Sequence, residues 1–452
     1  MKYIVPVPDI TLYEDGFGKF DLLDRRAKGR QLSELVERID DPLVIAIDGP
    51  WGSGKSFFLK CWVGAHSVEN EGSAKTVYFD AFENDFLDDP LLSLTSAITD
   101  RMGQNGNVGE GWTKVRTAAA KLWRPTTRIA LAMATAGASE VVGVVADAAL
   151  ESSKEELDKQ VDAFWRKEET RKAAMDGFRT ALTEITDTSQ ETGEQQKLVV
   201  VIDELDRCRP DYALSVLEVI KHFFTVPNVH FVLGVNLVEL ANSVKARYGS
   251  ETNTQLYLQK FITVTLNLPN SSGQRGQTKD VSLQYFSKMA KQMSLNPQMV
   301  DVVKSYLEIG SVRKSHSLRS MERLLTEMAL IPQVDQPFEK LYAGYQHVIS
   351  GLLVLKILFP DTYNLAKTKN LGMTDVRKLF DVPFPIDEDT DHKSTVINYA
   401  WASFLKPDEA GPRDGWRGMF DTFGLDNPEQ AFEAVLENFL EAVSFGGVPN
   451  GQ

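Results

Sequence analysis

The chain of 452 residues carries 49 Lys and Arg against 63 Asp and Glu, a formal net charge of −14 at pH 7. Hydrophobic residues make up 43% and charged residues 25% of the chain, which excludes a wholly disordered, collagen-like or coiled-coil protein. The acidic balance gives no overall electrostatic footprint for nucleic acid, and the opening residues lack the apolar core of a secretory signal, so we expect a cytoplasmic protein.

Short apolar runs alternate with helical periodicity in the first part of the chain and again after residue 196. The strands that we expect lie at 42–48, 75–82, 197–203, 229–235 and 260–269. The helices that we expect between them lie at 31–41, 54–66, 90–102, 210–224 and 237–249. Continuous apolar runs are typical of strands buried on both faces, so this order predicts an α/β fold with a parallel sheet flanked by helices.

The composition changes between about 103 and 190, where Gly, Ala and charged residues dominate and predict a helical insertion. Its stretch 129–150 is long enough to span a bilayer but contains Glu140 and Asp147. A mid-helix Asp costs about +2.5 to +3.5 kcal/mol on insertion scales, whereas each Leu, Ile or Val returns only about −0.3 to −0.6 kcal/mol. We therefore expect an Ala-rich helix or hairpin buried against protein, with contact to a membrane surface as the alternative.

A linker follows the last predicted strand at 271–279, and nearly everything after it has helical periodicity. The helices expected there lie at 280–293, 297–308, 317–331, 335–358 and 427–444, with an acidic loop at 385–394. The predicted organisation is a core of 1–102 and 191–270, the insertion at 103–190, a helical lid-like segment at 271–332 and a helical C-terminal domain at 333–452.

The sharpest motif is Gly-Pro-Trp-Gly-Ser-Gly-Lys-Ser at 49–56, which matches G-x-x-x-x-G-K-[ST] between a predicted strand and a predicted helix. Backbone N–H groups of such a Gly-rich turn, together with the helix N-terminus, form an anion site for phosphates. We expect Lys55 to reach the β- and γ-phosphates and Ser56 to coordinate Mg²⁺. The predicted nucleotide-binding residues are Gly49, Pro50, Trp51, Gly52, Ser53, Gly54, Lys55, Ser56 and Phe57.

A second motif ends the apolar run at 199–202 with Asp203 and Glu204. Asp203 is the predicted second ligand of Mg²⁺, and Glu204 is the predicted general base, catalytic together with Lys55. A glutamate directly after the magnesium aspartate points to the branch of P-loop proteins with an extra strand between the two motif strands. The run at 75–82 is either that strand or its neighbour. No guanine-reading Asn-Lys-x-Asp element occurs, so ATP is the expected nucleotide.

Four further residues are candidates to complete the site. Asn236 follows a predicted strand, where it would act as a γ-phosphate sensor, as the N-cap of the next helix, or as both. Arg207, Arg247 and Arg319 are candidates for an arginine finger or sensor, with a solvated or ion-paired side chain as the alternative for each.

The stretch VVVIDELDRCRPDYALSVLEVIKHFF at 199–224 resembles the KAP family of P-loop NTPases, whose signature has Asp-Glu-Leu-Asp-Arg-Cys before a Pro-containing helix start. The segments at 78–94, 231–244 and 257–269 resemble the family as well, although Phe82 stands where Trp is usual and Asn236 where Asp is common. Members often insert transmembrane helices between the two phosphate motifs, and bacterial members include phage-exclusion proteins.

The resemblance and the motifs together predict Mg²⁺-dependent ATP binding and hydrolysis that drives conformational change or assembly, with a role in bacterial defence against phage or foreign DNA. The alternative is a nucleotide-locked switch or scaffold with little turnover. A nucleic-acid-dependent motor is disfavoured by the acidic charge. The expected partner is a second copy of the chain or another protein.

Overall fold

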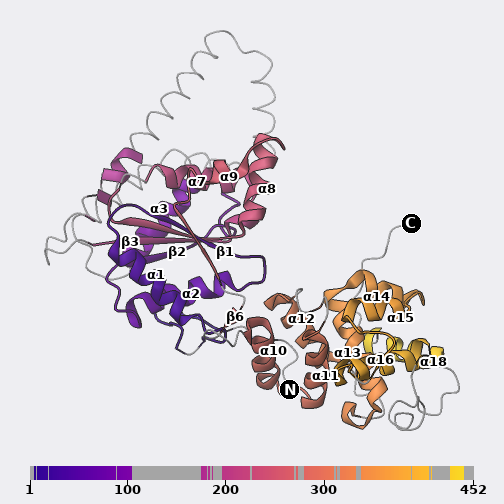
Figure 1. Ribbon diagram of the computed structural model, residues 1–452. Helices are drawn as coiled ribbons and strands as arrows, with labels where there is room; N and C mark the ends of the chain where they lie inside the picture. Colours follow the sequence, from indigo (N-terminus) through magenta and orange to yellow (C-terminus); the bar gives the residue numbers. More distant parts are fainter. Residues whose placement is uncertain are drawn as a thin grey trace, which may run out of the picture.

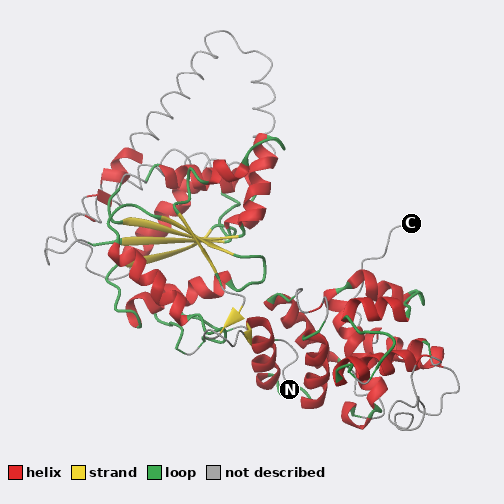
Figure 2. Cartoon of the chain, in the orientation of Figure 1, coloured by secondary structure: helices red, strands yellow, loops and turns green. Residues whose placement is uncertain are grey.

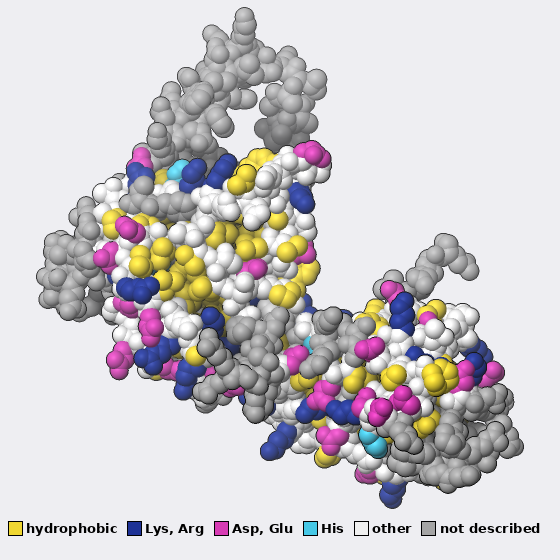
Figure 3. Space-filling view, in the orientation of Figure 1, with side chains coloured by type: hydrophobic (Ala, Val, Ile, Leu, Met, Phe, Trp, Pro, Cys, Tyr) yellow, Lys and Arg dark blue, Asp and Glu magenta, His cyan; other side chains and the backbone are white. Residues whose placement is uncertain are grey.

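The computed structural model of the chain describes residues 5–103, 175–186, 196–268, 271–272, 279–331, 337–409 and 428–441, apart from single residues and short runs inside these ranges. They form a lobe built on a sheet and a second, all-helical lobe that begins after the sheet is complete (Figure 1). On the face that Figure 3 shows, Lys and Arg of the described residues are interspersed with Asp and Glu over both lobes.

A five-stranded sheet, parallel throughout, forms the centre of the first lobe and confirms the predicted α/β fold class (Figure 2). Its strands are β1 (Val44–Asp48), β2 (Lys75–Asp80), β3 (Leu198–Asp203), β4 (Val229–Val235) and β5 (Val264–Asn267). The order is β2-β3-β4-β1-β5, so β4 is the extra strand between the two motif strands and β2 is the outer neighbour of β3. β3 and β4 are buried along their whole length, as their continuous apolar sequences predict.

Helices cover both faces of the sheet, because successive side chains of each strand point to opposite faces and both sets are apolar (Figure 1). The helices of this lobe are α1 (Arg26–Arg38), α2 (Lys55–Val68), α3 (Pro90–Gly103), the 3₁₀ turn η1 (Leu205–Arg207), α7 (Pro210–Lys221), α8 (Leu237–Tyr248) and α9 (Thr254–Leu258). α1 and α2 pack with Ile45 and Val201 on one face, and α3, α7 and α8 pack with Ala46 and Val200 on the other.

The second lobe surrounds the central helix α13, which packs against α11, α12, α14 and α16. The helices of this lobe are α10 (Val281–Gln292), α11 (Pro297–Leu307), α12 (Leu318–Leu330), η3 (Phe338–Lys340), α13 (Ala343–Leu358), α14 (Pro360–Lys367), α15 (Met373–Phe380), α16 (His392–Leu405), α18 (Pro428–Val435) and η5 (Leu436–Glu441). Helices α14, α15 and α16 were not predicted from the sequence, and the helix expected from residue 335 begins only at Ala343. Within the predicted linker, β6 (Ser271–Ser272) and β7 (Lys279–Asp280) form a small antiparallel pair.

Most of the predicted insertion at 103–190, including the stretch 129–150, lies outside the described residues. Residues 175–180 are helical, and the buried Phe178 ring packs edge-on against Phe223 with ring centroids 5.7 Å apart. None of the helices that the structure describes is long and apolar enough to cross a membrane.

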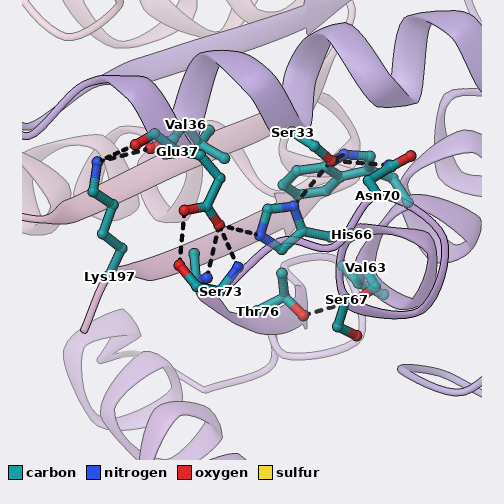
Figure 4. A network of polar contacts seen from close by, with 12 residues as sticks. Ser33, Val36, Glu37, Val63, His66, Ser67, Asn70, Ser73, Thr76 and Lys197 are labelled. Atoms are coloured by element: carbon teal, nitrogen blue, oxygen red, sulfur yellow. Dashed lines mark hydrogen bonds and ion pairs between the residues drawn. The ribbon is translucent and has the colours of Figure 1, made fainter. Parts of the chain in front are cut away.

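A buried polar network joins α1 to α2 near the amino ends of the strands (Figure 4). His66 lies between two residues of α1, with its Nδ1 2.9 Å from Ser33 Oγ and its Nε2 3.1 Å from a carboxylate oxygen of Glu37. Lys197, just before β3, donates to the carbonyls of Glu37 and Ile39 at 2.6 and 2.8 Å, and so satisfies the carboxyl end of α1. Burial lowers the pKa of His66, and the attraction of Glu37 opposes this effect.

Two buried imidazoles predict a loss of stability in mild acid. Burial lowers the pKa of His66, and burial with help from the charge of Lys197 lowers that of His230 to about 4 from 6.5. Between these values the unfolded chain binds protons that the folded chain does not, so the free energy of unfolding should fall as the pH drops from about 6.5 toward 4. His230→Asn, whose side-chain oxygen can accept the Leu43 N–H, should reduce the loss between pH 7 and pH 5 by about 2 kcal/mol in urea titrations. Equal losses in this variant, the wild type and the exposed control His222→Asn would contradict the assignment.

Candidate functional site

The phosphate loop lies where β1 ends and α2 begins, at the carboxyl edge of the sheet. Gly52 and Gly54 have φ of 76° and 81°, in the left-handed region that residues other than glycine rarely adopt. Gly54 is the N-cap of α2, so the amino end of this helix faces the loop, as the motif predicts.

Lys55 lies over this loop and is only 8% exposed. Its ammonium donates to the carbonyls of Gly49 and Pro50 at 2.6 and 3.3 Å. Burial lowers the pKa of Lys55, while the carboxylates of Asp206, Asp203 and Asp48 raise it. The hydroxyl of Ser53 in the same loop is buried and hydrogen-bonds to none of the described residues.

Ser56, Asp203 and Glu204 meet at this edge, although the two motifs are on strands separated by β4. The Ser56 hydroxyl donates to a carboxylate oxygen of Glu204 at 3.3 Å and also lowers the pKa of Asp203. Asp203 is fully buried, and burial raises its pKa to about 6, against the hydrogen bonds that it accepts. Serine and aspartate oxygens are the hard donors that Mg²⁺ prefers, so the pair fits this cation.

Protein side chains alone do not complete such a site. Among the described residues no group of three or more His, Cys, Asp or Glu side chains is arranged to hold a metal ion. Magnesium bound to Ser56 and Asp203 would therefore take its remaining ligands from phosphate and water oxygens, as it usually does in nucleotide sites.

Two contacts between distant parts of the sequence hold these groups in place. The Tyr78 hydroxyl on β2 donates to Asp203 at 2.8 Å, and burial raises the pKa of this tyrosine. The Trp51 indole N–H donates to Asp206 at 2.5 Å and thereby ties the phosphate loop to η1. Trp51 stays 46% exposed although its N–H is bound, and Asp206 is 7% exposed. Each pair joins residues more than a hundred positions apart, for which the sequence carries no local signal.

Glu204 has a strained backbone and an occupied carboxylate. Its φ of 58° and ψ of 24° place a non-glycine residue in the left-handed region, a strain that clusters at functional sites. One Arg207 nitrogen, Nη1, lies 2.9 Å from Oε1 and 3.0 Å from Oε2 of this glutamate. Arg207 was a candidate arginine finger or sensor, with a solvated or ion-paired side chain as the alternative. The structure shows it in an ion pair within the chain.

The remaining candidates lie at different distances from the loop. Asn236 ends β4 at the same edge, and its side chain accepts the Val238 N–H at 3.2 Å, so the N-cap alternative is present. Arg247 lies in the last turn of α8, at a distance of about 16 Å from Asn236 along the helix axis. Arg319 in the first turn of α12 abuts the phosphate loop, since a Cβ placed on Gly52 would lie 3.0 Å from the Arg319 Cβ.

A sequence model of the KAP family P-loop domain matches residues 29–334, more than half of the chain. This chain belongs to the KAP family of P-loop NTPases. The family resemblance read from the Asp-Glu-Leu-Asp-Arg-Cys run is thereby confirmed, and membership together with the phosphate loop identifies a nucleotide-binding protein.

No curated protein matches the chain. Among solved structures, the Aeropyrum pernix ORC2 protein with ADPNP and ADP is similar at 12% identity and a TM-score of 0.35, over 92% of this chain and 94% of that one. Cdc6p from Pyrobaculum aerophilum is similar at 13% identity and a TM-score of 0.35, over 92% of this chain and 80% of that one.

The buried carboxylate of Asp203 predicts a conflict between stability and site chemistry. Asp203→Asn removes a buried charge but keeps an oxygen for the Glu204 N–H, so we expect the midpoint of thermal unfolding without nucleotide to rise by about 2–4 °C. The same change should remove any additional stabilisation that Mg²⁺ gives with ATP. The exposed carboxylate variant Asp100→Asn should move the midpoint by less than this, and a lower midpoint in Asp203→Asn would show that the charge itself stabilises the fold.

Proposed function

We propose that this KAP protein binds ATP with Mg²⁺ and hydrolyses it. The observation that carries the proposal is the meeting of Lys55, Ser56, Asp203 and Glu204 at one sheet edge. This set supplies a cation for the phosphates, two hard ligands for magnesium and a carboxylate for water, which together are the parts that phosphoryl transfer to water requires.

Each residue has a separate role in this proposal. Lys55 and the N–H groups of the loop bind the β- and γ-phosphates, and Ser56 with Asp203 holds the magnesium ion. Bound magnesium supplies neutralisation of the charge that develops on the phosphate oxygens. Glu204 accepts a proton from water while the water oxygen bonds to the γ-phosphorus and the bond to the bridging oxygen breaks, which releases ADP and phosphate. Asn236 is at the edge where a γ-phosphate sensor would lie.

The contact between the lobes supports a conformational output. The Leu318 N–H at the start of α12 donates to the Gly52 carbonyl at 2.9 Å, so a helix of the second lobe is bonded directly to the phosphate loop. A phosphate bound at this loop would either compete with the Gly52 carbonyl for the Leu318 N–H or strengthen the hydrogen bond between them. We propose that nucleotide thereby moves the helical lobe, with Arg319 as the side chain that would sense the phosphates from there.

The second candidate function is a nucleotide-locked switch or scaffold, which the Arg207–Glu204 ion pair favours because it occupies the proposed base. The partner of either form is proposed to be a second copy or another protein, with Arg247 as the residue that would reach a neighbouring subunit, and contact with a membrane surface through 129–150 as the alternative. Defence against phage or foreign DNA stays a prediction from the family resemblance.

Two variants separate these functions. Lys55→Ala should weaken ATP binding at least about 10-fold with little loss of fold, because it removes a phosphate contact and little packing. Glu204→Gln should not weaken ATP binding but should lower steady-state phosphate release by roughly 10²–10⁴-fold. The exposed Lys245→Ala is the matched control and should change neither. Unchanged ATP binding in Lys55→Ala would refute the site, whereas tight binding without turnover in the wild type would support the switch.

A further inference from the structure

The ion pair between Glu204 and Arg207 is built into one turn of chain. Glu204 is the N-cap of η1 and Arg207 is its last residue, and the Arg207 N–H donates to the Glu204 carbonyl at 3.1 Å. Both oxygens of the glutamate lie within 3.0 Å of the same guanidinium nitrogen, and the side chains are only 17% and 31% exposed. The carboxylate that would activate water is therefore restrained from within its own motif.

The turn that carries Arg207 is bonded to the phosphate loop. Trp51 of the loop donates to Asp206, the residue before Arg207, at 2.5 Å. The Ser56 hydroxyl, at the start of α2, binds the same Glu204 carboxylate from the opposite motif. Arg207 and the first turn of α2 thus share one carboxylate. The guanidinium keeps its proton at any working pH.

Resting on the proposed function, we propose that Arg207 is a positioning residue that changes partners within one chain. Before ATP binds, it holds Glu204. The γ-phosphate, which carries more charge and accepts forked hydrogen bonds from a guanidinium, draws Arg207 away and leaves the Glu204 carboxylate to accept a proton from water. ADP lacks this phosphate and leaves the ion pair intact. Arg207 would then act in the same chain as its phosphate loop, rather than as a finger from a neighbour.

The test compares the affinities of a non-hydrolysable ATP analogue and of ADP, both with Mg²⁺, by calorimetry on the full chain. Arg207→Gln should weaken the analogue roughly tenfold and change ADP less than twofold. Glu204→Gln should strengthen the analogue several-fold by removing the competing carboxylate, and this gain should vanish in the double variant. Arg209→Gln is the matched control, because that neighbouring guanidinium donates to the Asp85 carbonyl and its loss should change neither affinity.

Several results would overturn the proposal. Equal weakening of both nucleotides in Arg207→Gln would indicate a structural role, and no weakening would mean that Arg207 does not touch the γ-phosphate. Arg207→Lys, which keeps the charge without the fork, should fall between the wild type and Arg207→Gln, and a melting curve on each variant shows whether the fold is intact. Recovery of phosphate release on mixing Arg207→Gln with Lys55→Ala chains would show action between subunits. A wild type that binds neither nucleotide would refute the proposed function itself, and this inference with it.

Discussion

The buried carboxylate of Asp203, held beside the hydroxyl of Ser56, is the constraint on which the site depends. The two residues meet only because β1 and β3 run parallel and end at the same edge, with β4 between them. Burying a carboxylate is unfavourable, and here the hydrogen bonds from the Tyr78 hydroxyl and the Glu204 N–H offset only part of the cost, since the pKa of Asp203 is still raised. An apolar side chain at the end of β3 would cost the fold nothing of this kind. The acid at this position therefore serves the chemistry of the site and lowers the stability of the fold.

The phosphate loop is restrained from three directions, which makes its geometry depend on the whole molecule. Trp51 ties it to η1, Leu318 of the second lobe donates to the Gly52 carbonyl, and the buried Arg25 donates to the Gly54 carbonyl at 3.2 Å. Burial lowers the pKa of Arg25 to about 10, yet its charge stays in place at neutral pH. The N-terminal segment that carries Arg25 also packs Leu23 into the hydrophobic core of the helical lobe. A displacement of the loop would consequently change contacts in both lobes, as a nucleotide-driven conformational change requires.

The sequence predicted the elements whose signals are local. Short apolar runs located the inner strands, and the alternation of polar and apolar residues at 260–269 located the edge strand β5. The loop motif located the phosphate site, because a phosphate loop needs particular residue types at fixed spacing. The helices α14, α15 and α16 were missed because each is short or follows Pro, Gly or a run of acids, which read as loop. Tyr78 and Asp206 were missed for a different reason. Their partners are distant in sequence, so only the register of β2 on β3 and the path of the chain after β3 bring them together.

The charges of the site argue for magnesium on grounds separate from the motif. Asp48, Asp203, Glu204 and Asp206 face two cations, Lys55 and Arg207. The Arg207–Glu204 pair neutralises one charge of each sign. What remains toward the phosphates is one ammonium against three carboxylates, of which Asp203 and Asp206 are buried. A nucleoside triphosphate carries several negative charges of its own, and in a partly desolvated site like charges repel strongly. A divalent cation beside Asp203 offsets this excess of negative charge. Release of Arg207 from Glu204 adds a further positive charge only when a γ-phosphate is there to attract it.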